Sequence, residues 1–257
     1  MFHFSFRGID FAHKLDDKKK PSENYEKHLH HFYEIVFFMK GKVRYVVEQE
    51  SKRLAPNDLV FINSGRSHFA EVDDEERYER YVLKFEKASL PPYLQDKVGS
   101  IKTFHKATPL LTNVFKRLDT IYGLYNDEEA YILYSAELTT LLVLLLHDES
   151  EIEGEYNEQI AKIVEWIDSH IEEPISLERI ASTFHYSPSQ ISNAFKKYAK
   201  MPIMKTIKMK KLIAARNDIR NGEKKNEVAL RYSFENYSTF YRLYTKAFHE
   251  SPSGKNK

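Results

Sequence analysis

Four side chains that can coordinate a metal ion or hydrogen-bond a small molecule lie in two short stretches of the first third of the chain. His28, His30 and Glu34 follow one another at spacings of two and four residues, and His68 lies further on. Because side chains alternate between the two faces of a strand, residues 28, 30 and 34 share one face if this segment is extended. Three imidazoles and one carboxylate inside a β structure can hold Fe, Mn, Ni or Zn. His31 would point to the opposite face.

Three interpretations of these four residues stay open at this point. They could contact a small-molecule effector, hold a divalent metal ion, or be polar core residues that satisfy one another. Clustered polar groups in a concave pocket are the default ligand site, which favours the first interpretation. Aromatic rings in the same region would suit a sugar or an aromatic effector, although ordinary core packing explains each of them as well. They are Phe32, Tyr33, Phe37, Phe38, Tyr45, Phe61 and Phe69.

A second group of residues with recognisable chemistry lies in the last third of the chain, at the start of two expected helices. Ser187-Pro188 is a helix-start signal, and Asn236 can cap a helix that begins at Tyr237. The second helix of a helix-turn-helix unit places its exposed N-terminal residues against base edges in the DNA major groove. Asn and Gln pair well with adenine, and Arg pairs well with guanine. We therefore expect base contacts from Ser189, Gln190, Asn193, Lys197, Tyr237, Ser238, Thr239 and Arg242.

Charge divides the chain at the same place. The total is +1, but residues 157–257 hold 18 Lys and Arg against 11 Asp and Glu, whereas residues 1–156 hold 21 against 27. A Lys-rich helical face is often only solvated, yet phosphate binding requires such a surplus. Double-stranded DNA is the expected partner. The expected phosphate contacts are Ser187, Lys196, Lys205, Lys208 and Lys246.

Composition excludes several other classes of protein. The chain has no cysteine, which excludes disulfides, thiolate metal sites and cysteine nucleophiles. It has 8 glycines and no glycine-rich phosphate-binding motif. The longest apolar run, residues 141–146, is far shorter than the roughly 20 residues of a membrane-spanning helix. The first ten residues do not have the pattern of a signal peptide. We expect a cytoplasmic protein with no membrane partner.

The order of expected elements indicates several domains. Residues from about 25 to 86 show short alternating strands between turns, which is typical of a small sandwich or barrel. From about residue 108 the period is helical, and residues 130–147 are apolar almost all round. Such a helix needs cover from its own domain or from a second copy. We expect an N-terminal β barrel at 1–105, a helical dimerisation segment at 106–147, an acidic linker at 148–156 and an all-α domain at 157–257.

In the last hundred positions, the types and spacing of particular residues are similar to those of a known protein family. Residues 157–253 resemble the DNA-binding domain of AraC-type bacterial transcriptional regulators. The resemblance implies two helix-turn-helix units joined by one long helix, with both recognition helices in successive major-groove segments on one face of DNA. The matching residues are Ile180-Ala181, Ser187, Ile191-Ser192, Phe195-Lys196, Lys211-Leu212, Ala215, Val228-Ala229, Ser233-Phe234, Ser238, Phe240, Arg242 and Ser251-Pro252.

The chain also departs from that family's pattern. The family usually has Gly where this chain has Lys200, Ser233 and His249, and usually has Arg at Asn193 and Lys211. Glycine is common where φ must be positive. We therefore expect Ser233 and His249 to adopt positive φ. The changes at Asn193 and Lys211 make a base preference transferred from the family unsafe.

The N-terminal part has a resemblance of its own. His28-x-His30-x3-Glu34-x6-Gly41 is similar to the first cupin motif, and Gly65-x2-His68 is similar to the core of the second. Asn57 and Asn63 replace the usual Gly and Pro. Many AraC-type regulators carry such a barrel as an effector sensor and keep similar histidines without a catalytic metal.

Together the two resemblances imply a sequence-specific transcriptional regulator, and not an enzyme. We expect it to be a homodimer that responds to a sugar or another small metabolite bound in the cupin-like barrel. No cofactor is expected, apart from the divalent metal that the His28, His30, Glu34 and His68 set could hold. The alternative is a metal-dependent cupin enzyme with a helical appendage.

Overall fold

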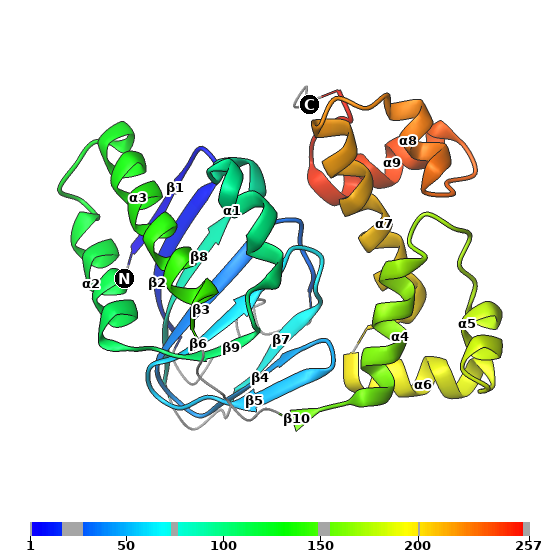
Figure 1. Ribbon diagram of the computed structural model, residues 1–257, viewed down its shortest axis with the longest axis horizontal. Helices are drawn as coiled ribbons and strands as arrows, with labels where there is room; N and C mark the ends of the chain where they lie inside the picture. The colour runs from blue at the N-terminus through cyan, green and yellow to red at the C-terminus, as the bar shows by residue number, and fades with distance from the viewer. Residues whose placement is uncertain (1, 17–27, 73–76, 149–154, 200, 254–257) are drawn as a thin grey trace. The chain divides into compact units, whose positions relative to one another are not determined.

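The chain divides into two compact units, Met1–Tyr156 and Asn157–Lys257, each with its own hydrophobic core (Figure 1). The computed structural model describes residues 2–16, 28–72, 77–148, 155–199 and 201–253. The first unit is β-rich with added helices and the second is helical, so the expected fold class is confirmed. Most of the expected acidic linker, residues 149–154, lies outside the described residues.

The described strands of the first unit form two antiparallel sheets and do not close into a single barrel (Figure 1). The six-stranded sheet has the order β1 (Phe2–Phe6), β2 (Ile9–Asp16), β8 (Tyr78–Phe85), β3 (Tyr33–Lys40), β6 (Asp58–Ile62) and β9 (Phe104–Lys106). The four-stranded sheet has the order β10 (Glu155–Tyr156), β5 (Glu50–Arg53), β4 (Val43–Val47) and β7 (His68–Val72).

Strand β3 is apolar on both faces because both faces are covered. Its residues Ile35 and Phe37 belong to a core shared with three helices, whereas Val36 and Phe38 belong to a second core with residues of the four-stranded sheet. Side chains alternate along a strand, so odd-numbered residues of β3 face the helices and even-numbered residues face the other sheet. This parity places Glu34 on the inner face, between the sheets.

Helices cover the outer face of the six-stranded sheet. They are α1 (Pro92–Lys97), α2 (Pro109–Ile121) and α3 (Asp127–Leu146), with short 3-10 turns η2 (Lys87–Ser89) and η3 (Val98–Ser100). By length and composition α3 could also cross a membrane, a property that core helices share. Its residues Tyr134, Leu138 and Leu141 are buried in the core that includes the sheet, so α3 is a core helix of this unit.

The second unit consists of six described helices. They are α4 (Glu158–Ser169), α5 (Leu177–Thr183), α6 (Pro188–Ala199), α7 (Ile203–Arg220), α8 (Lys225–Arg231) and α9 (Tyr237–Phe248). Ser176 and Asn236, two residue types that favour helix starts, both cap helices, since each side chain accepts a hydrogen bond from the backbone N–H three residues on. The pairs α5–α6 and α8–α9, joined by α7, correspond to the two helix-turn-helix units and the long helix that the family resemblance implies.

Helix α8 starts two residues before the position that its sequence predicts. Asn226 is a capping residue type and predicts a helix from Glu227, but α8 begins at Lys225 and its N-cap residue, Lys224, makes no side-chain cap. Lys224 Nζ instead lies 3.0 Å from Glu227 Oε1 across the first turn. This ion pair favours the earlier start, because it joins the N-cap residue to the third residue of the helix.

The two expected positive-φ residues are confirmed. Ser233 has φ of +59° and His249 has φ of +56°. His249 ends α9 in the left-handed conformation, and its N–H donates to Thr245 O. A residue with a Cβ is strained there, which explains why Gly is the more common residue at such helix ends.

This strain generates a stability prediction. We expect His249→Gly to raise the melting temperature of the second unit by about 2–6 °C, because relief of about 0.5–1 kcal/mol acts on a unit of about 100 residues. His147→Gly is the matched control, since His147 ends α3 at φ of −106° and gains nothing from Gly. Thermal unfolding followed by Trp166 fluorescence measures the change. An unchanged or lower melting temperature for His249→Gly would contradict the assigned strain.

Candidate nucleic-acid interface and effector site

The N-terminal half of α6 presents its polar residues to solvent. Ile191 and Phe195 are buried in the core of the second unit. This packing leaves Ser189, Gln190, Asn193 and Lys197 exposed. Helix α6 starts with a reciprocal cap, because Gln190 N–H donates to Ser187 Oγ at 3.2 Å and Ser187 N–H donates to Gln190 Oε1 at 2.8 Å. Gln190 must leave this cap before it can contact a base.

Helix α9 is built in the same way. Phe240 and Tyr244 are buried, and Asn236 Oδ1 accepts from Thr239 N–H at 2.8 Å. Ser238 and Arg242 are exposed, whereas Tyr237 and Thr239 are half-buried. Tyr237 packs its ring near Phe240, with ring centroids 5.9 Å apart. Ser238 and Arg242 of α9 are therefore accessible to a partner, whereas the ring of Tyr237 packs against Phe240 of the same helix.

Helix α7 fixes the two helix pairs within the second unit. Ile203 and Ile207 at its start belong to the core that contains α6. Midway, Lys211 Nζ donates to Glu173 O at 2.6 Å and to Tyr232 O at 3.0 Å, which joins the segment before α5 to the end of α8. Burial lowers the pKa of Lys211.

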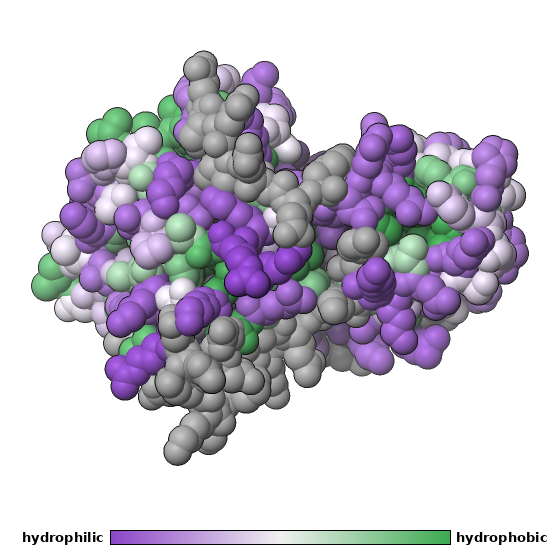
Figure 2. All heavy atoms as spheres, turned by 90° about the horizontal axis from the view of Figure 1, so that it is seen from below, coloured by the Kyte–Doolittle hydropathy of each residue, from purple (hydrophilic) through white to green (hydrophobic). Residues whose placement is uncertain are grey.

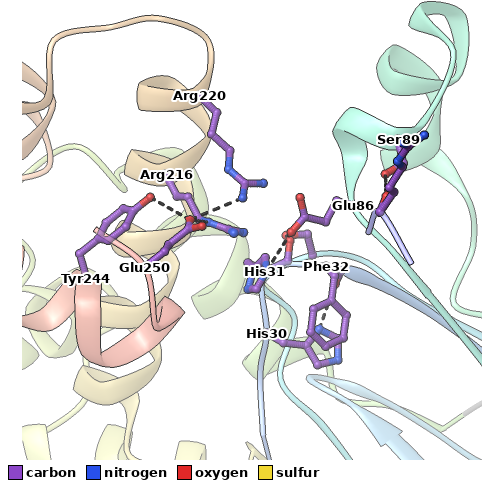
Figure 3. Close-up of polar contacts among 11 residues, drawn as sticks. His30, His31, Phe32, Glu86, Ser89, Arg216, Arg220, Tyr244 and Glu250 are labelled. Carbon is purple, nitrogen blue, oxygen red and sulfur yellow. Dashed lines mark hydrogen bonds and ion pairs between the residues drawn. The ribbon is translucent and has the colours of Figure 1, made fainter. Parts of the chain in front are cut away.

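The far end of α7 is tied to the residues that follow α9. Arg216 Nε donates to Glu250 Oε1 at 2.7 Å, and Arg220 and Tyr244 approach the same oxygen at 3.5 and 3.4 Å (Figure 3). Because Arg216 is buried, this contact is a structural ion pair and not a surface one. No sequence motif marks the roles of Lys211 and Arg216 in joining these segments.

The expected phosphate contacts are all exposed. Figure 2 shows hydrophilic side chains over most of the face of the second unit that it presents. Lysine and arginine dominate this part of the chain, with 16 of them against 5 Asp and Glu from residue 185 onward. The exposed candidates are Ser187, Lys196, Lys205, Lys208 and Lys246.

Four residues of the first unit form what we call the histidine cluster: His28, His30, Glu34 and His68. Each offers one ligand atom, and these atoms lie within 4.8 Å of one another. His30 Nε2 is 2.8 Å from Glu34 Oε2, and His68 Nε2 is 3.7 Å from the same oxygen. The sequence therefore predicted a set of residues that the fold brings together.

The backbone of the cluster differs from the expected strand. Strand β3 begins only at Tyr33, and His28 instead forms an isolated antiparallel bridge with His68, with N···O distances of 3.2 and 3.0 Å. The bridge, and not strand parity, brings His28 to the cluster. His31 points elsewhere as expected, because its Nε2 lies 3.3 Å from Glu86 Oε1 (Figure 3).

The surroundings set the charge of the cluster. Burial raises the pKa of Glu34, but the hydrogen bond from His30 and the positive charge of Lys84 outweigh this effect and hold that pKa well below its usual range. Burial lowers the pKa of His68 to about 3. At neutral pH the cluster therefore contains a carboxylate beside a neutral, fully buried imidazole.

A small polar cavity of about 20 Å³ adjoins the cluster. His28, Glu34 and Tyr45 line it together with three cations that sequence analysis missed, Lys14, Arg80 and Lys84. These cations share the inner face because Lys14 pairs with Arg80 and Glu34 pairs with Lys84 across neighbouring strands. As the described residues line it, this cavity has room for about one water molecule and is too small for a sugar. Of the expected aromatic lining only Tyr45 is present, and Tyr33, Phe37 and Phe61 pack instead toward the helices.

The contacts of Lys211 generate a second stability prediction. We expect Lys211→Met to lower the free energy of unfolding by about 1–3 kcal/mol, because the buried carbonyl group of Tyr232 and the part-buried carbonyl group of Glu173 lose their donor. Lys208→Met, on the exposed face of the same helix, should change it by less than about 0.5 kcal/mol. Urea denaturation of both variants measures the difference. Equal midpoints for the two variants would show that Lys211 does not tie the helices together.

Comparisons with known proteins match the same two units. The family model described as AraC-like ligand binding domain matches residues 16–146, and one described as helix-turn-helix domain matches residues 180–256. A XylDLEGF operon transcriptional activator of Pseudomonas putida is 26% identical over 242 residues, which cover 86% of this chain and 73% of that one. The transcriptional activator RhaS of Enterobacter sp. is 23% identical over 249 residues, which cover 92% and 89%.

One solved structure aligns with both units of the chain. ToxT from Vibrio cholerae aligns over 96% of this chain and 97% of its own, at 12% identity and a TM-score of 0.39. The family relationship rests on the two family matches and on the sequence relatives, which align across both units, and not on this weak structural likeness.

Proposed function

The chain belongs to the AraC-type family of transcriptional regulators, and from this premise we propose that it binds specific DNA sequences under the control of a small effector sensed by the first unit. The matched families are a ligand-binding domain and a helix-turn-helix domain, and the named relatives are transcriptional activators. The chain is thus a transcription factor and not a cupin enzyme. Because its target is DNA, we propose that it acts in the cytoplasm.

One observation carries the DNA-binding proposal. Two capped helices, α6 and α9, keep their polar N-terminal residues accessible while α7 holds both pairs in one packed unit. Gln190 and Asn193 suit adenine, and Arg242 suits guanine. The exposed lysines, Lys196, Lys205, Lys208 and Lys246, would bind phosphates and supply affinity without sequence preference.

Dimerisation through α3 is proposed for a different reason. The face of α3 that points away from the sheet includes Ile132, Ala136, Thr140 and Val143, all exposed and spaced three or four residues apart. Ile132 is 64% exposed, and Leu124 in the preceding turn is 71% exposed. A row of apolar and small residues on one helix face suits a second copy of the same helix.

The histidine cluster is the proposed effector site. It is a group of polar residues between the two sheets, with Glu34 on β3 of one sheet and His68 on β7 of the other. An effector that favours one arrangement of the first unit would shift the population of the DNA-binding state.

The division between base and phosphate contacts is testable by substitution. We expect Arg242→Ala to weaken binding by about 1–3 kcal/mol at one base position and to relax specificity there. Lys196→Ala should weaken binding to all sequences evenly and reduce the salt slope by about one. Fluorescence anisotropy on a selected duplex and on its single-base variants, at several salt concentrations, measures both. A salt-independent affinity, or equal effects of the two variants on all duplexes, would refute the proposal.

The dimer proposal predicts a change in mass. Wild-type protein should sediment as a dimer, and Ile132→Glu combined with Val143→Glu should sediment as a monomer, because two charges would then face the partner copy without compensation. Tyr93→Glu is the control, since Tyr93 is 63% exposed on α1 and does not belong to the proposed row of residues on α3. A wild-type monomer at tens of micromolar, or an unaltered dimer in the double variant, would argue against this surface.

A further inference from the structure

We propose that a polar contact between the helix pairs α5–α6 and α8–α9 sets the spacing of the two DNA blocks that this chain binds. The contact joins the loop between α4 and α5 to the turn between α8 and α9 (Figure 1). We call it the junction, and it consists of Glu172, Glu173, Lys211, Tyr232 and Ser233. The spacing role rests on the proposed function, whereas the contact itself stands on the structure alone.

Two side chains donate to consecutive carbonyl groups of the loop. Ser233 Oγ donates to Glu172 O at 2.7 Å, and Lys211 Nζ donates to Glu173 O at 2.6 Å. The same Nζ donates to Tyr232 O at 3.0 Å, so one buried ammonium group bridges the loop and the turn. Hydrogen bonds depend on direction as well as on distance, and a charged donor strengthens them. The three bonds therefore hold the loop and the turn in one orientation.

Each side of the junction is also fixed to its own helix pair. Arg179 of α5 donates to Glu173 Oε2 at 2.5 Å and to Pro174 O at 2.9 Å, which holds the loop against the first pair. In the turn, Phe234 N–H donates to Ala229 O of α8 at 3.1 Å. A shift of one helix pair is therefore transmitted through the junction to the other.

Helix α7 needs this support, because the two helix pairs do not share one apolar core. The core that contains α6 includes Ile203 and Ile207 of α7 but, among the described residues, none from α8 or α9. Helix α7 has 18 residues, which corresponds to a length of about 27 Å. A bend of about 15° at its middle would move either end by about 3.5 Å, close to the roughly 3.4 Å rise of one base pair. Lys211 lies at that middle, so the junction opposes such a bend.

The junction contains two of the positions at which this chain departs from the family pattern. The family usually has Arg at Lys211 and Gly at Ser233. Ser233 has φ of +59°, a conformation that strains any residue with a Cβ and that Gly adopts freely. Gly has no hydroxyl group that could donate to Glu172 O. The strained serine therefore supplies a contact between the helix pairs that the more common residue does not.

The turn between α5 and α6 offers a matched comparison. His185 follows the C-cap residue of α5 as Ser233 follows that of α8, and its φ is +58°. The N–H groups of both residues donate to the carbonyl group three residues back, at Ser182 and Leu230. The His185 side chain is exposed and makes no hydrogen bond with the residues that the structure describes. His185→Gly therefore relieves the same strain as Ser233→Gly and leaves the junction intact.

The first experiment tests the contact without DNA. Thermal unfolding of the full chain, followed by Trp166 fluorescence, compares Ser233→Gly with His185→Gly. Both variants should fold, because each removes left-handed strain. We expect His185→Gly to raise the melting temperature, and Ser233→Gly to raise it by at least about 2 °C less, because the lost hydrogen bond offsets the relief. Equal shifts would overturn the contact.

The second experiment measures the spacing role with the full chain. The probes are the duplex that the wild type enriches from a random pool and versions of it with one base pair added or removed between the two blocks. The spacing penalty is the ratio of the Kd for an altered duplex to the Kd for the selected one. We expect this penalty to fall by about threefold in Ser233→Gly and by about tenfold in Lys211→Met, and to stay within about 1.5-fold of wild type in His185→Gly.

The two experiments separate the possible failures. An unchanged spacing penalty in both Ser233→Gly and Lys211→Met overturns the spacing role, even where the thermal comparison supports the contact. If the chain enriches no DNA sequence, the proposed function fails and the spacing role fails with it, whereas the thermal comparison still decides the contact. Circular dichroism checks the fold of each variant, and Ser233→Gly alone decides the outcome if Lys211→Met does not fold.

Discussion

The burial of α7 is the constraint on which the second unit depends. A helix that joins two small helix pairs must pack on both, and α7 does so with apolar residues at its start and with polar ties further along. Ile203 and Ile207 pack into the first core, Lys211 caps two carbonyl groups midway, and Arg216 pairs with Glu250 at the far end. Neither seven-residue helix, α5 or α8, would be stable alone. Their packing on longer helices holds the two recognition helices in place.

A comparable constraint governs the first unit. Strand β3 is covered on both faces, and its alternate side chains point into two different cores. Tyr33, Ile35 and Phe37 pack in the core that includes the helices, and Val36 and Phe38 pack in the core between the sheets. Glu34 has the parity of the second, which puts a carboxylate where the neighbouring strand contributes Lys84 and the other sheet contributes His68. The polar site between the sheets thus follows from the register of two strands.

Local signals in the sequence predicted the second unit well. The helix starts of this unit are indicated by the capping side chains of Ser176 and Asn236 and by Pro188 and Pro202. These residues favour a helix start through interactions within a few residues of the chain. Even the strained positions, Ser233 and His249, were predictable as replacements for glycine. The start of α8 was not predictable from such signals. The first four N–H groups of a helix have no intrahelical partner, so a side-chain ion pair, here Lys224 with Glu227, can shift the first residue of the helix.

The first unit was less predictable because its details depend on contacts between distant residues. The spacing of the histidines indicated a cluster, but His28 arrives there through a bridge to His68, forty residues away. No motif in the sequence marks Lys14, Arg80 or Lys84. The pattern does not show that a second sheet covers their face, so their role beside the cluster needed the structure. Whether α3 pairs with a second copy depends likewise on contacts outside the chain.

In vitro selection of duplex DNA from a random pool, using the full chain, tests the central claim most directly. Two recognition helices fixed by α7 in one unit predict an enriched site with two short conserved blocks about one helical turn, roughly 10 base pairs, apart. Enrichment of a single block, or of no sequence at all, would contradict an account in which α6 and α9 enter successive major grooves.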